Sequence, residues 1–97
     1  MKVEYHPAIK HELQEIVKCY NRCSQGLGTE FLSEFELQIL NISSMPTQWM
    51  IVKDNIRRSL MKRFPYAIYF RALKNDVLRV MIVKHQRRHP NYGQSRR

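Results

Sequence analysis

The sequence has no long apolar run. Hydrophobic residues make up 43% of the 97 residues, but no stretch reaches the roughly 18 consecutive apolar residues of a membrane-spanning helix, so we predict no membrane span. The first residues also lack the apolar core of a signal peptide, and we therefore expect a cytoplasmic protein. With this length and hydrophobic content we expect a single domain over residues 1–97.

The motifs of several enzyme classes are also missing. There is no phosphate-binding glycine loop, no nucleophile elbow and no zinc-ligand spacing. Cys19 and Cys23 are the only cysteines, which is too few for a disulfide framework or a zinc site, so we expect both to be reduced and partly buried on one helix. The basic half of the chain lacks the paired acids of a two-metal site, and we predict neither a metal nor a cofactor.

Acidic residues are rare in the second half. Residues 1–52 contain four Lys or Arg and six Glu, a net charge of −2, whereas residues 53–97 contain thirteen Lys or Arg and two Asp, a net charge of +11. No acidic residue follows Asp76. This asymmetry predicts a polyanionic partner: nucleic acid, the ribosome, a membrane surface or an acidic protein. The alternative is a solvated basic face that keeps the protein soluble.

The first half of the chain predicts a short strand and two helices. Residues 2–6 alternate weakly, as in an edge strand. Pro7 then suits the first position of a helix, and Thr29 is a plausible N-cap for a second helix. The link at residues 26–28 is short, so we expect an antiparallel helical hairpin. Apolar residues recur at spacings of three and four in both helices: Ile9, Leu13, Ile16, Val17 and Tyr20, then Phe31, Leu32, Phe35, Ile39, Leu40 and Ile42.

The second half predicts the strands of a sheet. Residues 49–52 form a brief apolar run, strand or turn, and residues 57–63 read as a strand with basic residues on both faces. Residues 66–73 alternate clearly, residues 74–76 suit a hairpin turn, and residues 77–83 are apolar almost throughout, as in a central strand covered on both faces. We predict an α+β fold: a small, mostly antiparallel sheet packed against an N-terminal two-helix hairpin. The polar tail over residues 90–97 is expected to be flexible.

A cluster of reactive side chains follows the last predicted strand. His85, Arg87, Arg88, His89 and Tyr92 lie within eight residues. His exchanges protons near neutral pH, Arg binds phosphate bidentately, and Tyr stacks on a base or acts as an acid. A metal-free ribonuclease needs these residue types. Alternatively, His85 caps the strand and the arginines bind an acidic partner.

A second basic group lies on the preceding predicted strand. It consists of Arg57, Arg58, Lys62 and Arg63, to which we add Lys84 beside His85. One interpretation is contact with phosphates of a nucleic acid or with a target protein. The other is a charged strand edge that prevents edge-to-edge pairing of sheets. A helix-turn-helix DNA binder is not favoured, because the helices lie in the acidic half.

The order of these features resembles the RelE/ParE superfamily of bacterial toxins. The resemblance covers essentially the whole chain: strand, two helices joined by Gly-Leu-Gly, a Pro-x-x-Trp motif and three basic strands. Its most specific pieces are Arg57-Arg58, then Phe64-Pro65-Tyr66 with Ile68 and Tyr69, and then Val83-x-His85-x-Arg87-Arg88-x-Pro90.

The resemblance implies the toxin of a type II toxin–antitoxin pair. Its partner would be an acidic antitoxin whose C-terminal segment wraps the toxin in a hetero-oligomer, and no membrane partner is implied. ParE-like members inhibit DNA gyrase, whereas RelE-like members cut mRNA in the ribosomal A site without metal. Arg58 and Tyr92 match nuclease positions, but Ala67 and Gln86 stand where those toxins have arginines.

We therefore favour a ParE-like toxin that binds a target such as DNA gyrase. Arg57, Lys62, Arg63 and Lys84 are its expected binding residues. The alternative is a RelE-like, metal-independent mRNA endoribonuclease, with Arg58, His85, Arg87, Arg88 and Tyr92 as its catalytic candidates. A basic RNA-binding module without toxicity is a third hypothesis.

Overall fold

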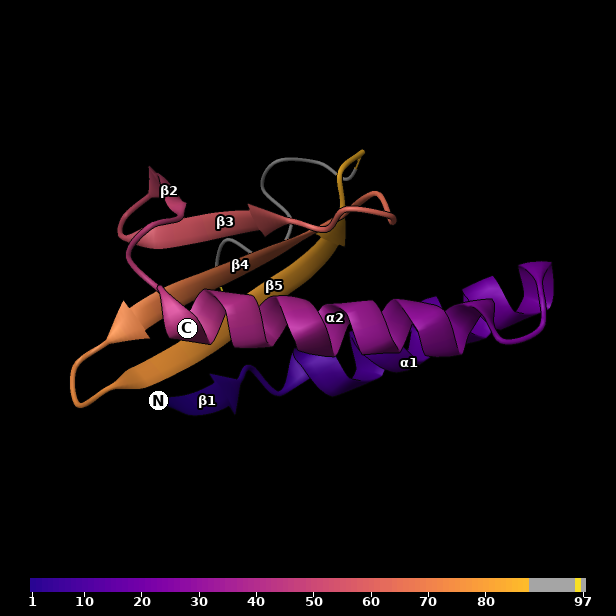
Figure 1. The fold of residues 1–97 in the computed structure, drawn as a ribbon, viewed down its shortest axis with the longest axis horizontal. Helices are drawn as coiled ribbons and strands as arrows, with labels where there is room; N and C mark the ends of the chain where they lie inside the picture. The colour runs from indigo at the N-terminus through magenta and orange to yellow at the C-terminus, as the bar shows by residue number, and fades with distance from the viewer. Residues whose placement is uncertain (88–95, 97) are drawn as a thin grey trace.

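A computed structural model describes residues 1–87 and Arg96. The described elements, in chain order, are β1 (Lys2–Tyr5), α1 (Ala8–Cys23), α2 (Leu27–Ser44), β2 (Met50–Lys53), β3 (Ile56–Leu60), β4 (Tyr66–Leu73) and β5 (Val77–His85). The strands form one sheet in the order β1-β5-β4-β3-β2. β1 is parallel to β5 and the other pairs are antiparallel. Both helices run side by side along one face of the sheet (Figure 1), which confirms the predicted α+β fold.

The core lies between the helices and the sheet. Phe31 and Ile42 of α2 and Ile68 and Phe70 of β4 are completely buried. At one end of this layer, aromatic rings contact one another edge to face or tilted, with centroid separations of 5.0 to 5.7 Å; they belong to Tyr20, Phe31, Phe64 and Tyr66. The apolar stripes predicted on both helices therefore pack against the alternating apolar residues of β4 and β5.

The hairpin between β4 and β5 follows the sequence prediction. In the three-residue turn at 74–76, Asn75 and Asp76 have positive φ angles of 62° and 59°, a conformation that Asn and Asp tolerate better than other non-glycine residues do. β5 lies between β1 and β4, and six of its nine residues are buried. Its almost continuous apolar sequence is thus that of a central strand.

The turn between the helices differs from the prediction. α2 begins at Leu27, directly after Gly26 with its φ of +83°, so Thr29 lies inside the helix and is not its N-cap. The Gly28 N–H donates to Asn21 Oδ1 at 2.8 Å. A Cβ at Gly28 would lie 2.3 Å from the Val17 carbonyl oxygen. Glycine here allows the two helices to approach closely.

Three smaller expectations need correction. Leu40 is 66% exposed rather than part of the apolar stripe, and Cys19 and Cys23 are free but exposed rather than partly buried. β3 ends at Leu60, because the chain turns toward Pro65, which cannot donate to a strand ladder; residues 62 and 63 therefore follow the strand. The short apolar run, predicted as a strand or a turn, forms the strand β2, whose four residues are all exposed.

Among the described residues, no helix has the length and apolarity to cross a membrane. Apart from Arg96, the predicted flexible tail at residues 90–97 lies outside the described residues.

Candidate functional site

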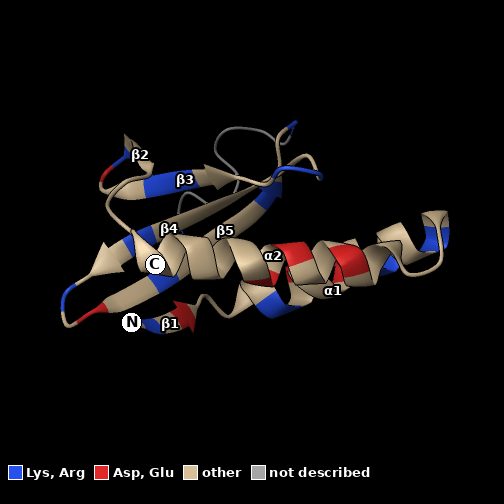
Figure 2. Cartoon of the chain, viewed as in Figure 1, with Lys and Arg blue, Asp and Glu red and all other residues tan. Residues whose placement is uncertain are grey.

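The face of the sheet opposite the helices carries a group of basic side chains around one tyrosine. We call it the basic face and define it by Arg58 of β3, Tyr69 and Arg71 of β4, and Arg79 and Lys84 of β5. Successive residues of a strand point to opposite faces of the sheet. The residues next to these in the sequence, such as Phe70 and Val83, point to the other face and pack into the helix layer. Figure 2 shows Lys and Arg on all three strands, whereas α2 carries acidic residues.

The strand register brings these side chains together. Arg58 pairs with Tyr69 across β3 and β4, and Arg71 pairs with Arg79 across β4 and β5. Lys84 is only 8% exposed, and its Nζ lies 5.0 Å from the centroid of the Tyr69 ring. A cation over an aromatic face is favourable, so Lys84 is held against Tyr69 rather than extended into solvent.

The predicted binding residues on and after β3 are not brought together. Arg57 lies on the helix-covered side, where its Nη1 donates to the carbonyl oxygens of Thr47 at 3.0 Å and Trp49 at 2.7 Å. Arg63 pairs with Glu30 of α2 at 3.2 Å. Lys62 is exposed in the segment between β3 and β4. Of the residues predicted on this segment, Arg58 alone belongs to the basic face.

His85 lies at a second site, a pocket of about 340 Å³ between α1 and the end of β5. Its walls include His11, Glu15 and Cys19 from α1 and Tyr66 and His85 from the strands. The Tyr66 and His85 rings meet edge to face at 5.2 Å. The pocket therefore places two imidazoles and a phenol around one space, and the α1 residues were not predicted because helical spacing does not reveal what faces a distant strand.

The ring nitrogens of His85 are distinguishable. Its Nδ1 accepts the backbone N–H of Arg87 at 3.1 Å, so in the neutral imidazole the proton lies on Nε2. Arg87 is exposed just beyond β5. The other two catalytic candidates, Arg88 and Tyr92, lie outside the described residues.

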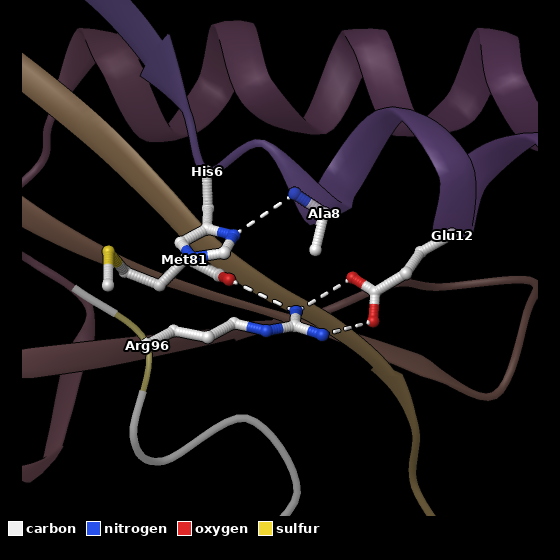
Figure 3. Close-up of polar contacts among 5 residues, drawn as sticks. All are labelled: His6, Ala8, Glu12, Met81 and Arg96. Carbon is white, nitrogen blue, oxygen red and sulfur yellow. Dashed lines mark hydrogen bonds and ion pairs between the residues drawn. The ribbon is translucent and has the colours of Figure 1, made fainter.

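A third site lies around Arg96, and the sequence did not predict its contacts (Figure 3). The two terminal nitrogens of Arg96 bind the Glu12 carboxylate at 2.8 and 2.7 Å, and one of them also donates to the Met81 carbonyl oxygen at 3.3 Å. Nearby, His6 Nδ1 accepts the Ala8 N–H at 3.1 Å. The pKa of His6 is lowered below its usual value. Desolvation is the main cause, and the positive charges of Arg96 and of the β5 arginine lower the pKa further.

No metal-ligand group of three or more His, Cys, Asp or Glu occurs within residues 1–87 together with Arg96. The side chains of the basic face and of the pocket around His85 offer guanidinium, ammonium, imidazole, phenol, thiol and carboxylate groups.

Comparison with known proteins identifies the fold. No protein-family model and no curated protein matches the sequence. A chain from a solved structure, the chromosomal ParDE TA system from P. aeruginosa, is similar to this one with a TM-score of 0.76 and 13% sequence identity. The match covers 88% of this chain and 95% of that chain. It confirms the RelE/ParE-like fold that the sequence resemblance predicted.

Proposed function

We propose that this protein is the toxin of a type II toxin–antitoxin system, acting in the cytoplasm by binding a target such as DNA gyrase. The observation that carries the proposal is the similarity in fold to a chain of the ParDE system over 88% of this sequence. A small acidic antitoxin, bound in a hetero-oligomer, neutralises the toxin. The strongly basic second half of the chain is complementary in charge to such a partner.

The basic face is the best candidate for target binding. Its side chains stand on three neighbouring strands of one sheet, which holds them more accurately than loops do. Arg58 and Arg71 make no ion pair with any described residue, in contrast to Arg63, which pairs with Glu30. Their charge is available for contacts with an acidic or phosphate-bearing surface.

Induced expression in a bacterial host tests this proposal. We expect growth arrest, a DNA-damage response and intact messages, with purified protein inhibiting gyrase supercoiling. Co-expression of the adjacent antitoxin gene restores growth. If expression leaves growth unchanged while the protein is folded, the toxin proposal is wrong and a non-toxic RNA-binding module takes its place.

The pocket around His85 supports a second candidate, a metal-independent mRNA endoribonuclease. Its specific support is that His11, Tyr66 and His85 line the same space. In such a reaction one group removes the proton of a ribose 2′-OH, the oxygen attacks the adjacent phosphorus, and a second group protonates the leaving 5′ oxygen. Arg58, Arg87, Arg88 and Tyr92 are the further residues proposed for this activity.

Mapping of mRNA 5′ ends minutes after induction separates the two candidates. The nuclease gives new ends at fixed codon positions in translated messages only. The double substitution His85→Gln, Tyr92→Phe then lowers cleavage by about 10² or more, because it removes the proton-transfer groups. A gyrase binder with the same substitutions stays folded and toxic, and its messages stay intact.

A further inference from the structure

The side chain of Arg96 joins the C-terminal end of the chain to the first helix. Its Nη1 and Nη2 donate to Glu12 Oε1 and Oε2 at 2.8 and 2.7 Å, so a guanidinium fork meets a carboxylate fork (Figure 3). Nη1 also donates to the carbonyl oxygen of Met81 on β5 at 3.3 Å. One guanidinium group therefore binds α1 and the sheet at the same time.

This contact is shielded from water. The side chains of Arg96 and Glu12 are 15% and 11% exposed, whereas those of Arg63 and Glu30, which form another ion pair, are 58% and 54% exposed. Exposed pairs contribute little, because water and salt compete for both charges. A bidentate pair with little exposure is screened less, and removing one partner leaves the other charge shielded from water. The Arg96 contact should therefore persist in solution, and it requires both side chains.

Glu12 also lines the pocket around His85. That pocket holds the imidazoles of His11 and His85, and the carboxylate that binds Arg96 forms part of its wall. Arg96 places a positive charge beside this carboxylate and orients it through two hydrogen bonds. If Arg96 leaves, the carboxylate loses that charge and both bonds, and the pocket becomes more negative. A residue near the end of the chain thus controls the charge of a pocket between α1 and β5.

We propose that Glu12 and Arg96 form a clasp, a conformational device with a closed and an open state. In the closed state, the C-terminal end of the chain is fastened to α1 and β5, and the Glu12 carboxylate is fixed in the pocket wall. In the open state, both are released. Arg96 is thus a positioning residue for the pocket around His85, and it acts through Glu12. The clasp goes beyond the proposed toxin activity, because it concerns how the chain holds its own C-terminal end.

Digestion with carboxypeptidase B, followed by mass spectrometry, tests the closed state. This enzyme removes arginines one at a time from a C-terminus, and the chain ends in Ser95-Arg96-Arg97, so it can release two. We expect the second arginine to leave about tenfold faster or more from Glu12→Gln than from wild type, because a closed clasp must open before the enzyme reaches Arg96. Glu15→Gln is the matched control: it removes the same charge from the same pocket wall and should leave the rate unchanged.

A second variant keeps the test informative if Glu12→Gln fails to fold. Glu12→Asp retains the charge and shortens the side chain by one methylene, so it cannot hold Arg96 in the same bidentate geometry. Its second arginine should also leave faster than that of wild type. Equal rates for wild type, Glu12→Asp and Glu15→Gln would mean that no clasp protects Arg96, and the proposal would be refuted.

The imidazole of His6 reports on Arg96 independently. Desolvation lowers its pKa most, the positive charges of Arg96 and Arg79 lower it further, and the charge of Glu12 raises it. Arg96→Gln removes one of the positive charges, so an NMR titration should give a higher His6 pKa in this variant than in wild type. Arg22→Gln, at the far end of α1, should leave it unchanged. Identical His6 titrations for wild type and Arg96→Gln would mean that Arg96 is not docked in solution.

Thiol modification tests whether the clasp acts on the pocket. Cys19 lines the pocket, and Cys23 is exposed but is not among the lining residues, so the two thiols serve as probe and internal control. In Arg96→Gln we expect an anionic methanethiosulfonate reagent to modify Cys19 more slowly relative to Cys23, because the pocket is more negative. A neutral reagent should keep the wild-type ratio. An unchanged ratio with the anionic reagent would refute the positioning role of Arg96. None of these results depends on toxicity.

Discussion

The two faces of the sheet use the same strands for different purposes. On the helix-covered face, Ile68 and Phe70 of β4 are completely buried against α1 and α2. On the basic face, the intervening residues are Tyr69, with a polar ring, and Arg71, whose charge forms no ion pair with a described residue. Alternation along one strand thus separates the residues that stabilise the fold from those available to bind a partner. Substitutions on the two faces should differ accordingly in their effects on stability and on activity.

The largest predicted effect is the loss of a core aromatic ring. Phe31 is completely buried and contacts the rings of Tyr20, Phe64 and Tyr66. Phe31→Ala should lower the free energy of unfolding by about 3–5 kcal/mol, since it removes packing and leaves a cavity. Urea denaturation measures the change. Arg58→Gln on the basic face should stay within about 0.5 kcal/mol of wild type, and a comparable loss there would contradict the separation of roles.

The close approach of the two helices gives the next largest effect. Gly28→Ala should destabilise by about 1–3 kcal/mol, because its Cβ meets the Val17 carbonyl and the Asn21 side chain. Gly26 has open space around its Cα and a φ of +83°, so Gly26→Asn is a control that adds a side chain tolerant of that conformation. Thermal denaturation should show a clearly lower Tm for Gly28→Ala than for Gly26→Asn.

A buried polar contact joins the helix layer to the sheet. The Gln38 side-chain amide of α2 donates to the Ser59 hydroxyl of β3, and both residues are buried. Ser59→Ala should cost about 1–3 kcal/mol, because it leaves the amide buried without its acceptor. Gln38→Leu combined with Ser59→Ala should cost less than the sum of the single changes. Additive losses in this double-mutant cycle would mean that the contact contributes nothing.

The smallest effect concerns pH. Because the pKa of His6 is lowered in the fold, the unfolded chain binds a proton first as the pH falls below about 6.5, and stability decreases there. Protonation also removes the Nδ1 acceptor used by the Ala8 N–H. His6→Asn keeps an acceptor that does not titrate, so its Tm should fall less than the wild-type Tm between about pH 7.5 and pH 5. Parallel curves would contradict this role.

The sequence predicted the elements better than their contacts. Alternation identified β4, and Asn75-Asp76 identified its turn, since both signals are local. The prediction of Thr29 as the N-cap of α2 was wrong. The start of α2 depends on the contact of Gly28 with the preceding helix, which is a tertiary contact that local sequence does not reveal.

Contacts between distant segments could not be predicted. The opposition of Arg71 and Arg79 depends on a register that shifts at a bulge between Tyr69 and Phe70, and alternation within either strand does not specify that shift. The bond from Arg96 to Glu12 spans 84 residues and has no local signal at all. Two of the five residues that define the basic face, Arg58 and Lys84, were therefore predicted as site residues, and the arginines of β4 and β5 were missed.

Induced growth arrest tests most directly whether the basic face is the surface through which the proposed toxin acts on its target. We would compare wild type with a triple variant, Arg58→Gln, Arg71→Gln and Arg79→Gln, after confirming by circular dichroism that the variant folds.

A second triple variant provides the matched control. It removes three exposed charges from α1, at Lys10, Lys18 and Arg22, and so lowers the net charge equally. We predict that wild type and the α1 variant arrest growth while the basic-face variant does not. Growth arrest by the folded basic-face variant as strong as that of wild type would contradict the account.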